Sequence, residues 1–308
     1  MNFVEALGAF PLILTEGSIV ERLRRDPAVE LDPILVNARL PAAPASAGGR
    51  ALAALHAGYI EVALRAGRPL LCVTDTWRAS AERIRQAGLE GVDLNGAAVR
   101  FLADIRAAHP EAAARIAIAG QIGCRGDAYR PEEALAPEEA LAFHRPQVAS
   151  LARAGVDLLF AVTLPALSEA IGIARAFAET GLPAVLSFVI RPDGTLLDGT
   201  PLIQAAESID AATGARRPTG YMVNCVHPSV LAAAAARGAL PGRFLGLQAN
   251  GSPLSPEELD GCATLQSQEP EAFAREFAAV ARTCGLKVVG GCCGTDERHI
   301  TALAAALA

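Results

Sequence analysis

Short apolar runs alternate with longer amphipathic stretches along most of the chain. Eight of these runs are apolar on both faces, as expected for strands of a buried parallel sheet. The predicted strands are residues 11–15, 69–74, 115–120, 156–163, 183–190, 220–225, 243–249 and 286–291. The pattern therefore predicts a parallel sheet that is covered on both sides.

Amphipathic helices are predicted between the strands. The clearest examples are residues 145–155, 167–181 and 270–285, and each ends on a glycine, a common residue at helix C-termini. Residues 40–50 are rich in Pro, Ala, Ser and Gly and are predicted to form a loop. Eight strands, each followed by a helix, favour an α/β fold of the (β/α)8 TIM-barrel type. A doubly wound open sheet is the alternative, but the count of eight and the absence of a Rossmann fingerprint favour the barrel.

Composition narrows the class of protein. The 308 residues are 52% hydrophobic, which is enough for a large core, and barrels of this size commonly form one domain, here residues 1–308.

A net charge of −6 and the lack of a Lys/Arg run argue against nucleic-acid binding. The apolar runs are too short to span a bilayer, and the first 14 residues carry Glu5 and no basic segment, so neither a membrane partner nor a signal peptide is expected. The oligomeric state cannot be derived from these features.

The cysteines carry the main chemical signal. The seven are Cys72, Cys124, Cys225, Cys262, Cys284, Cys292 and Cys293. An odd count at irregular spacing does not resemble a secreted disulfide framework, so a reducing cytoplasm is expected. In a barrel, catalytic groups lie at the carboxyl ends of the strands. Cys225 ends the sixth predicted strand, and Cys292 and Cys293 follow the eighth, so these three thiols are expected to converge.

Three converging thiolates are a soft ligand set that suits Zn2+, and a fourth, open position is typical of catalytic zinc. In this interpretation, Gly290, Gly291 and Gly294 allow the sharp turn that brings two successive side chains to one metal. Other interpretations of the turn stay open. It could bind phosphate, with Thr295 capping the last helix. The adjacent cysteines could form a redox disulfide, or each could simply pack in the core.

Several motifs together resemble the homocysteine S-methyltransferase family. The C-terminal "GGCCGTDERHI" resembles the family's GGCCGT signature, and "VNCVHP" resembles its Asn-Cys segment. The segments "LTEGSIVERL", "VTDTWRAS", "FHRPQVASLARAGVDLLFAVTLPALSEA" and "SFVIRPDGTLLDGT" are similar to the first, second, fourth and fifth strand regions of the family. The resemblance implies a zinc-dependent enzyme of methionine biosynthesis whose zinc ligands are Cys225, Cys292 and Cys293. It also implies methyl transfer to the thiol of homocysteine, giving methionine, from S-methylmethionine, S-adenosylmethionine or a betaine-like donor.

Substrate contacts are expected at the same strand ends. The resemblance places Glu16 where it could bind a substrate ammonium group, and the amides of Gly17 and Ser18 could meet a carboxylate. In the fourth-strand motif, Thr163 belongs to the substrate site, and Asn224 is expected to orient Cys225. Aromatic side chains bind sulfonium or quaternary ammonium donors, for which Trp77 and Tyr129 are candidates.

The chain departs from the family motifs at two positions. Val162 stands where the family usually has a Glu that holds the substrate amino group, so another acceptor thiol, or a non-catalytic zinc or thiol sensor, is an alternative. Cys124 replaces a residue that is often Pro. A phosphate-binding barrel enzyme is a further alternative, but it needs a strand-end lysine or a His and Glu pair, and Lys287, the single lysine, lies at the wrong end of its strand.

The remaining histidines and cysteines are expected to be structural. His56, His109 and His144 are predicted to face solvent or to form local hydrogen bonds, and His299 to be structural. His227 is predicted to lie in a loop, with support of the nearby Cys225 as the alternative. The other three cysteines, Cys72, Cys262 and Cys284, are predicted to lie in the core or at the surface without a chemical function.

Overall fold

The eight predicted strands form a closed parallel barrel in the computed structural model, which describes residues 3–255, 258 and 265–308. The strands are β1 (Ile13–Thr15), β2 (Leu70–Val73), β3 (Ile116–Ile122), β4 (Leu158–Leu164), β5 (Ala184–Phe188), β6 (Gly220–Val226), β7 (Phe244–Ala249) and β8 (Val288–Gly291). Each strand pairs with its neighbour in sequence, and β8 pairs with β1 to close the ring. The predicted (β/α)8 barrel is confirmed.

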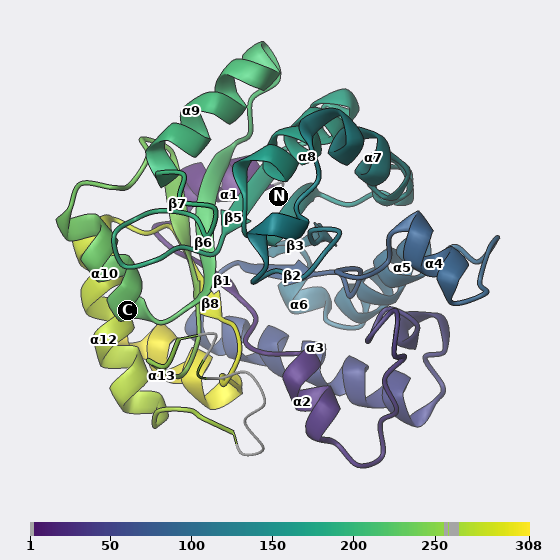
Figure 1. Cartoon of the computed structure of the whole chain (residues 1–308). Helices are drawn as coiled ribbons and strands as arrows, with labels where there is room; N and C mark the ends of the chain where they lie inside the picture. The colour runs from purple at the N-terminus through teal and green to yellow at the C-terminus, as the bar shows by residue number, and fades with distance from the viewer. Residues whose placement is uncertain (1–2, 256–257, 259–264) are drawn as a thin grey trace.

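Helices surround the ring of strands (Figure 1). They are α1 (Phe3–Ala9), α2 (Val20–Arg25), α3 (Ala47–Ala66), α4 (Ala81–Gln86), α5 (Leu94–Ala107), α6 (Pro110–Ala113), α7 (Pro137–Ala154), α8 (Leu167–Thr180), α9 (Leu202–Thr213), α10 (Pro228–Ala236), α12 (Pro270–Cys284) and α13 (Glu297–Ala306). Short 3-10 turns are η1 (Leu40–Ala42), η2 (Pro131–Glu133) and η3 (Gly214–Arg216). The three predicted amphipathic helices are confirmed, and each ends at a glycine with positive φ. No described helix is long and apolar enough to cross a membrane.

Two apolar cores hold the barrel together, one inside the ring and one outside it. Inside, side chains such as Ile13, Phe160 and Met222 fill the barrel. Phe3 and Ala6 of α1 join this inner core beside the N-terminal parts of the strands, so α1 closes that end of the barrel. The outer core lies between the strands and the helices and contains the alternate residues of each strand. Closure of one end leaves the carboxyl ends of the strands as the open face.

The predicted loop at residues 40–50 is partly wrong, because residues 47–50 form the first turn of α3. Ser46 caps this helix by accepting a hydrogen bond from the amide of Gly49. Gly49 lies so close to the preceding loop that an added Cβ would come within 2.3 Å of the Ala43 carbonyl oxygen. Tight packing against the loop, which composition does not reveal, explains glycine at this helical position.

Candidate metal centre

The three cysteines predicted to converge do so at the open face of the barrel. The sulfur atoms of Cys225, Cys292 and Cys293 all lie within 4.8 Å of one another. Cys225 is buried near the end of β6, and Cys293 is exposed on the turn after β8. The sulfur atoms of Cys225 and Cys292 are in direct contact, and the Cα atoms of these residues lie 5.5 Å apart. Cys292 and Cys293 do not form the disulfide between adjacent residues that the sequence left open, because Cys293 is a free thiol and the sulfur of Cys292 contacts that of Cys225.

An unusual backbone conformation directs the Cys225 side chain toward the turn. Cys225 has a φ of +56°, and Thr163 at the end of β4 has a φ of +57°. The left-handed region is unfavourable for residues with a Cβ, above all for β-branched threonine, and such strain concentrates at functional sites. The strand pairing shifts register beside each of the two residues. Both strand ends are thus bent where the sulfur cluster forms.

The side chain of Asn224 connects these two bent strand ends. Its Oδ1 accepts a hydrogen bond of 2.9 Å from the amide of Thr163, and its Nδ2 donates to the Thr163 hydroxyl at 2.8 Å. The same Nδ2 lies 3.4 Å from the sulfur of Cys225. Asn224 thus makes the contact with the Cys225 sulfur that the predicted orienting role requires, and Thr163 has its amide and hydroxyl bound to Asn224.

Removal of this amide is expected to weaken metal binding without unfolding the protein. In Asn224→Ala, zinc affinity should fall by about 10- to 100-fold, as for other groups that orient metal ligands. Competition with a chromogenic chelator measures this change. Asn95→Ala is the matched control, because Asn95 is also buried but its amide bonds to the carbonyl of Ala79. Equal zinc affinities for the two variants would contradict this role of Asn224.

The glycines of the cysteine turn act mainly by their small size. Only Gly294 of the three predicted glycines has a positive φ, of +78°. A Cβ on Gly290 would lie 1.9 Å from the hydroxyl oxygen of Thr15, and one on Gly291 would lie 2.0 Å from that of Thr295. The prediction of a sharp turn therefore holds for Gly294 alone, whereas Gly290 and Gly291 allow β8 to pack closely against its neighbours.

The predicted phosphate site is not formed, because carboxylates already occupy the amides of the turn. Glu21 accepts a hydrogen bond from the Gly294 amide at 2.5 Å. Asp296, and not Thr295, caps α13 and accepts from the amides of Arg298 and His299. An anion here would meet two negative side chains, so the phosphate-binding alternative is wrong for this turn.

Glu16 lies in the layer between the strands and α3 and forms its contacts inside the protein. Glu16 is buried, with its Oε1 2.5 Å from Nδ1 of His56, and its Oε2 accepts a hydrogen bond from the amide of Val73 at 3.0 Å. Nε2 of His56 lies 3.0 Å from Asp75, which also accepts a 2.6 Å hydrogen bond from Asn37. Protein groups therefore occupy the carboxylate for which the sequence predicted a substrate ammonium.

The histidine on α3 is buried and charged, contrary to the prediction of a solvent-facing residue. Burial alone lowers the pKa of His56, but the adjacent carboxylates of Glu16 and Asp75 raise it to about 10. His144 is buried as well, and its Nε2 lies 2.8 Å from Glu169.

The other three histidines fit their predictions. The Nδ1 of His109 lies 2.9 Å from the Ile105 carbonyl oxygen in the same helix. His227 precedes α10 and contacts Ser229, and His299 forms a capping box with Asp296.

The remaining predicted contact residues are largely engaged with the protein itself. Ser18 donates its amide to the Thr295 carbonyl oxygen at 3.2 Å, and an added Cβ on Gly17 would lie 2.6 Å from the Tyr59 hydroxyl. The Trp77 ring is covered by the guanidinium of Arg78, 4.1 Å from the ring centre. One face of Trp77 is therefore already occupied by a cation. Tyr129 is 39% exposed in the loop after β3.

The other thiols lie outside the sulfur cluster. Cys124 is buried, its sulfur donates to the Gly126 carbonyl oxygen, and burial with the nearby Glu169 raises its pKa to about 12. Cys72 is buried in the outer core and Cys284 is partly buried against it, as predicted for packing residues. Cys262 falls outside the described residues.

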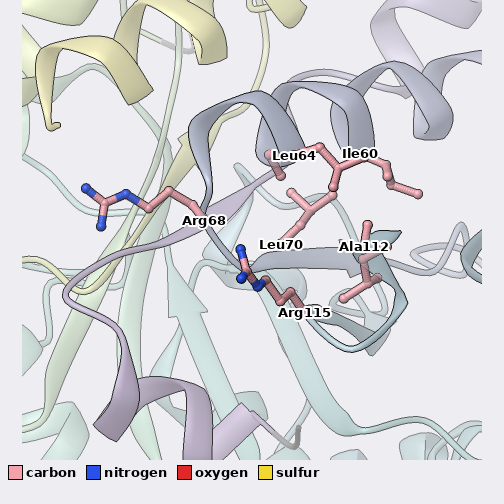
Figure 2. Close-up of a pocket in the computed structure, with 8 residues that line it drawn as sticks. Ile60, Leu64, Arg68, Leu70, Ala112 and Arg115 are labelled. Carbon is pink, nitrogen blue, oxygen red and sulfur yellow. The ribbon is translucent and has the colours of Figure 1, made fainter. Parts of the chain in front are cut away.

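A separate small cavity of about 10 Å³ lies at the other end of the barrel. Figure 2 shows it between the end of α3 and the starts of β2 and β3, with Arg68 and Arg115 at its edge. Because it lies at the amino ends of the strands, it is not part of the sulfur site.

Comparison with known proteins identifies the family of the chain. The family model described as homocysteine S-methyltransferase matches residues 13–307. Homocysteine S-methyltransferase YbgG of Bacillus subtilis (strain 168) is 30% identical over 208 residues, 64% of this chain and 61% of that protein. Homocysteine S-methyltransferase of Escherichia coli (strain K12) is 30% identical over 202 residues, 63% of each chain. The chain therefore matches less than two thirds of the length of these curated relatives.

Solved structures show the same fold over nearly the whole chain. The oxidised form of the homocysteine methyltransferase MmuM from Escherichia coli superposes with a TM-score of 0.78 at 25% identity, covering 99% of both chains. Its metallated form gives a TM-score of 0.74 at 24% identity and 97% coverage of both chains. With the family model spanning residues 13–307, the chain belongs to the homocysteine S-methyltransferase family.

Proposed function

We propose that this protein transfers a methyl group from a small donor to the thiol of homocysteine and so produces methionine. The observation that carries the proposal is the convergence of Cys225, Cys292 and Cys293 at the open face, with sulfur atoms within 4.8 Å of one another. Residues 1–308 act in it as one domain. The reducing cytoplasm expected from the cysteine pattern would keep these thiols available.

The donor set fits a zinc ion held by the three cysteines. Sulfur ligands of a tetrahedral zinc ion lie roughly 3.8 Å apart, so the observed cluster needs only small side-chain adjustments. Three protein ligands leave one position for a substrate, the catalytic arrangement. When bound, zinc would hold the acceptor sulfur as a thiolate at neutral pH, whereas a free thiol with a pKa near 8.5 is mostly protonated.

The chain supplies orientation and exclusion of water around this centre. Asn224 would hold the Cys225 sulfur in place, and its 3.4 Å contact with this sulfur supports that role. Below the cluster, Val162 and Phe160 belong to the buried inner core, so the wall beneath the acceptor is dry. Alignment of the two substrates in a site without water contributes a large part of the rate acceleration that an enzyme can provide for such a transfer.

A sensor of zinc or of thiol oxidation is the second candidate. The contact between the sulfur atoms of Cys225 and Cys292 favours it, because an oxidant would join these two thiols and the resulting disulfide would not bind zinc as thiolates. Val162 favours it too, since no carboxylate is supplied at that position of β4. A sensor would bind zinc and release it on oxidation but would not transfer methyl groups.

A direct assay distinguishes these two functions. Reduced, zinc-loaded protein is incubated anaerobically with homocysteine and, in turn, S-methylmethionine, S-adenosylmethionine and glycine betaine, and methionine is measured by mass spectrometry. We expect zinc-dependent methionine formation with at least one donor. Stoichiometric zinc binding without methionine from any donor would reject the methyltransferase in favour of the sensor.

A further inference from the structure

On three alternate strands, the last side chain that points into the barrel is polar and uncharged. They are Gln121 on β3, Ser187 on β5 and Gln248 on β7. Successive side chains of a strand point to opposite faces, and each of the three has at least one sequence neighbour in the outer core: Ile122 beside Gln121, Leu186 and Phe188 beside Ser187, and Leu247 and Ala249 beside Gln248. All three therefore point into the barrel at its open end.

The strand registers place these three residues at one level. Gln121 pairs with a residue of β4 that in turn pairs with Val185 on β5. In the same way, Ser187 pairs with a residue of β6 that pairs with Gly246 on β7. Because the strands of an eight-stranded barrel are tilted, residues at the same height along the barrel axis differ from the hydrogen-bonded pairing by about two positions for every two strands. Two residues beyond Val185 and Gly246 are Ser187 and Gln248. The three side chains thus form one layer, which we call the polar layer.

The polar layer has hydrogen-bonding capacity that the described protein does not use. The Ser187 hydroxyl is fully buried and has no hydrogen-bond partner. Gln248 donates from Nε2 to the Thr15 hydroxyl at 3.0 Å, which leaves its carbonyl oxygen available. The backbone of Gln121 accepts a hydrogen bond from the Thr76 hydroxyl and donates one to the Thr74 hydroxyl, and neither bond involves its carboxamide. A buried hydroxyl without a partner is costly, so a hydrogen-bonding group placed against Ser187 would be stabilising.

This layer lies directly beside the sulfur cluster. Gln248 is paired in the sheet with Asn224, whose side chain is 3.4 Å from the Cys225 sulfur. The next residue of β7, Ala249, accepts a 2.7 Å hydrogen bond from the amide of Cys292. A molecule whose sulfur lies at the cysteines can therefore place its other end on the polar layer.

The three side chains that form the layer, those of Gln121, Ser187 and Gln248, carry no charge. Val162 contributes an apolar wall, and Glu16 and Asp75 are paired with His56 behind the strands. A ligand group with a net charge would lose its hydration here without gaining an opposite charge. Carboxamides, in contrast, offer N–H donors to a carboxylate and a carbonyl acceptor to an ammonium group.

We propose that Gln121, Ser187 and Gln248 form the subsite for the polar end of the acceptor thiol and select an end with no net charge. A zwitterionic α-amino acid meets this condition, and a thiol with only a carboxylate or only an ammonium group does not. The inference rests on the proposed function for the identity of the acceptor, and it assigns its recognition to residues of β3, β5 and β7.

Binding of three thiols of similar length tests this selection. Calorimetric titration of reduced, zinc-loaded protein compares homocysteine with 4-mercaptobutanoate and 3-mercaptopropylamine. We expect homocysteine to bind about 10-fold tighter or more, because each analogue leaves part of the layer without a partner. Gln121→Met and Gln248→Met should each reduce this preference by about 10-fold. If turnover is present, KM should rise while kcat changes little.

Two further variants separate recognition from stability. Ser187→Ala removes the unpaired buried hydroxyl, so its melting temperature should stay equal or rise while homocysteine binds more weakly. Gln86→Met is the matched control, because Gln86 is exposed on α4 and bonds to Glu82. It should bind all three thiols as the wild type does.

The outcomes distinguish this inference from the proposed function. Equal affinity for the three thiols, or an unchanged preference in folded Gln121→Met and Gln248→Met, would overturn the subsite. Selective binding of homocysteine that depends on the layer would support it even if no donor gives methionine, and in that case only the proposed methyl transfer would be lost.

Discussion

Cys225→Ser is expected to lose most of its bound zinc, with zinc affinity at least roughly 100-fold lower than in the wild type. The substitution exchanges a soft thiolate for a hydroxyl, a poor ligand for zinc, and leaves only Cys292 and Cys293 on the other side of the site. Methyl transfer should fall with the metal content. The measurement is zinc per chain by mass spectrometry after anaerobic gel filtration, combined with the methionine assay.

Cys124→Ser is the matched control for this prediction. Cys124 is also buried near the open face, but its sulfur bonds to the Gly126 carbonyl oxygen and lies outside the cluster. This variant should keep its zinc, because serine can donate the same hydrogen bond. Full zinc content in Cys225→Ser, or loss of zinc in Cys124→Ser, would contradict the assignment of the site to β6 and β8.

His56→Leu is expected to lower the free energy of unfolding by about 3–5 kcal/mol. His56 is fully buried and lies between the carboxylates of Glu16 and Asp75, at 2.5 Å and 3.0 Å. Without the imidazolium, two buried carboxylates face each other with no positive charge between them. Urea unfolding measures the loss. His109→Leu is the control, since His109 is only partly buried and should change stability by about 0.5 kcal/mol or less.

The same charge network predicts how stability depends on pH. The pKa of His56 is raised from 6.5 to about 10, so the folded protein retains a proton that the unfolded chain loses. The stabilisation is complete below pH 6.5, falls by about 1.4 kcal/mol per pH unit above it, and is lost once the pH passes 10. In His56→Leu this component of the pH dependence should vanish. An identical decrease in both proteins between pH 7 and pH 10 would show that His56 is not charged in the folded state.

The barrel was predictable because each strand is apolar on both faces. Both the inner and the outer core need apolar residues, so strands such as β4 (Leu158–Leu164) are continuous hydrophobic runs. The convergence of Cys225 with Cys292 followed from the rule that parallel strands of a barrel end on one face. These predictions use local patterns and a property of the whole fold, and neither requires knowledge of individual contacts.

Contacts between distant segments explain what the sequence did not predict. Glu16 and His56 are 40 residues apart, and no local pattern indicates that the carboxylate turns away from the open face toward α3. The role of Gly290 also depends on a distant residue, because the hydroxyl of Thr15 occupies the space that a Cβ would need. The left-handed backbone of Thr163 occurs together with its hydrogen bonds to the distant Asn224, and the residue type of Thr163 gives no sign of it.

X-ray absorption at the zinc edge tests the central claim most directly, because it counts the sulfur atoms bound to the metal. The reduced, zinc-loaded protein should show three sulfur ligands, from Cys225, Cys292 and Cys293, and one lighter ligand. Saturating homocysteine should raise the count to four sulfur atoms. A count that stays at three with homocysteine bound, or that is below three without it, would contradict a metal centre that receives the acceptor thiol.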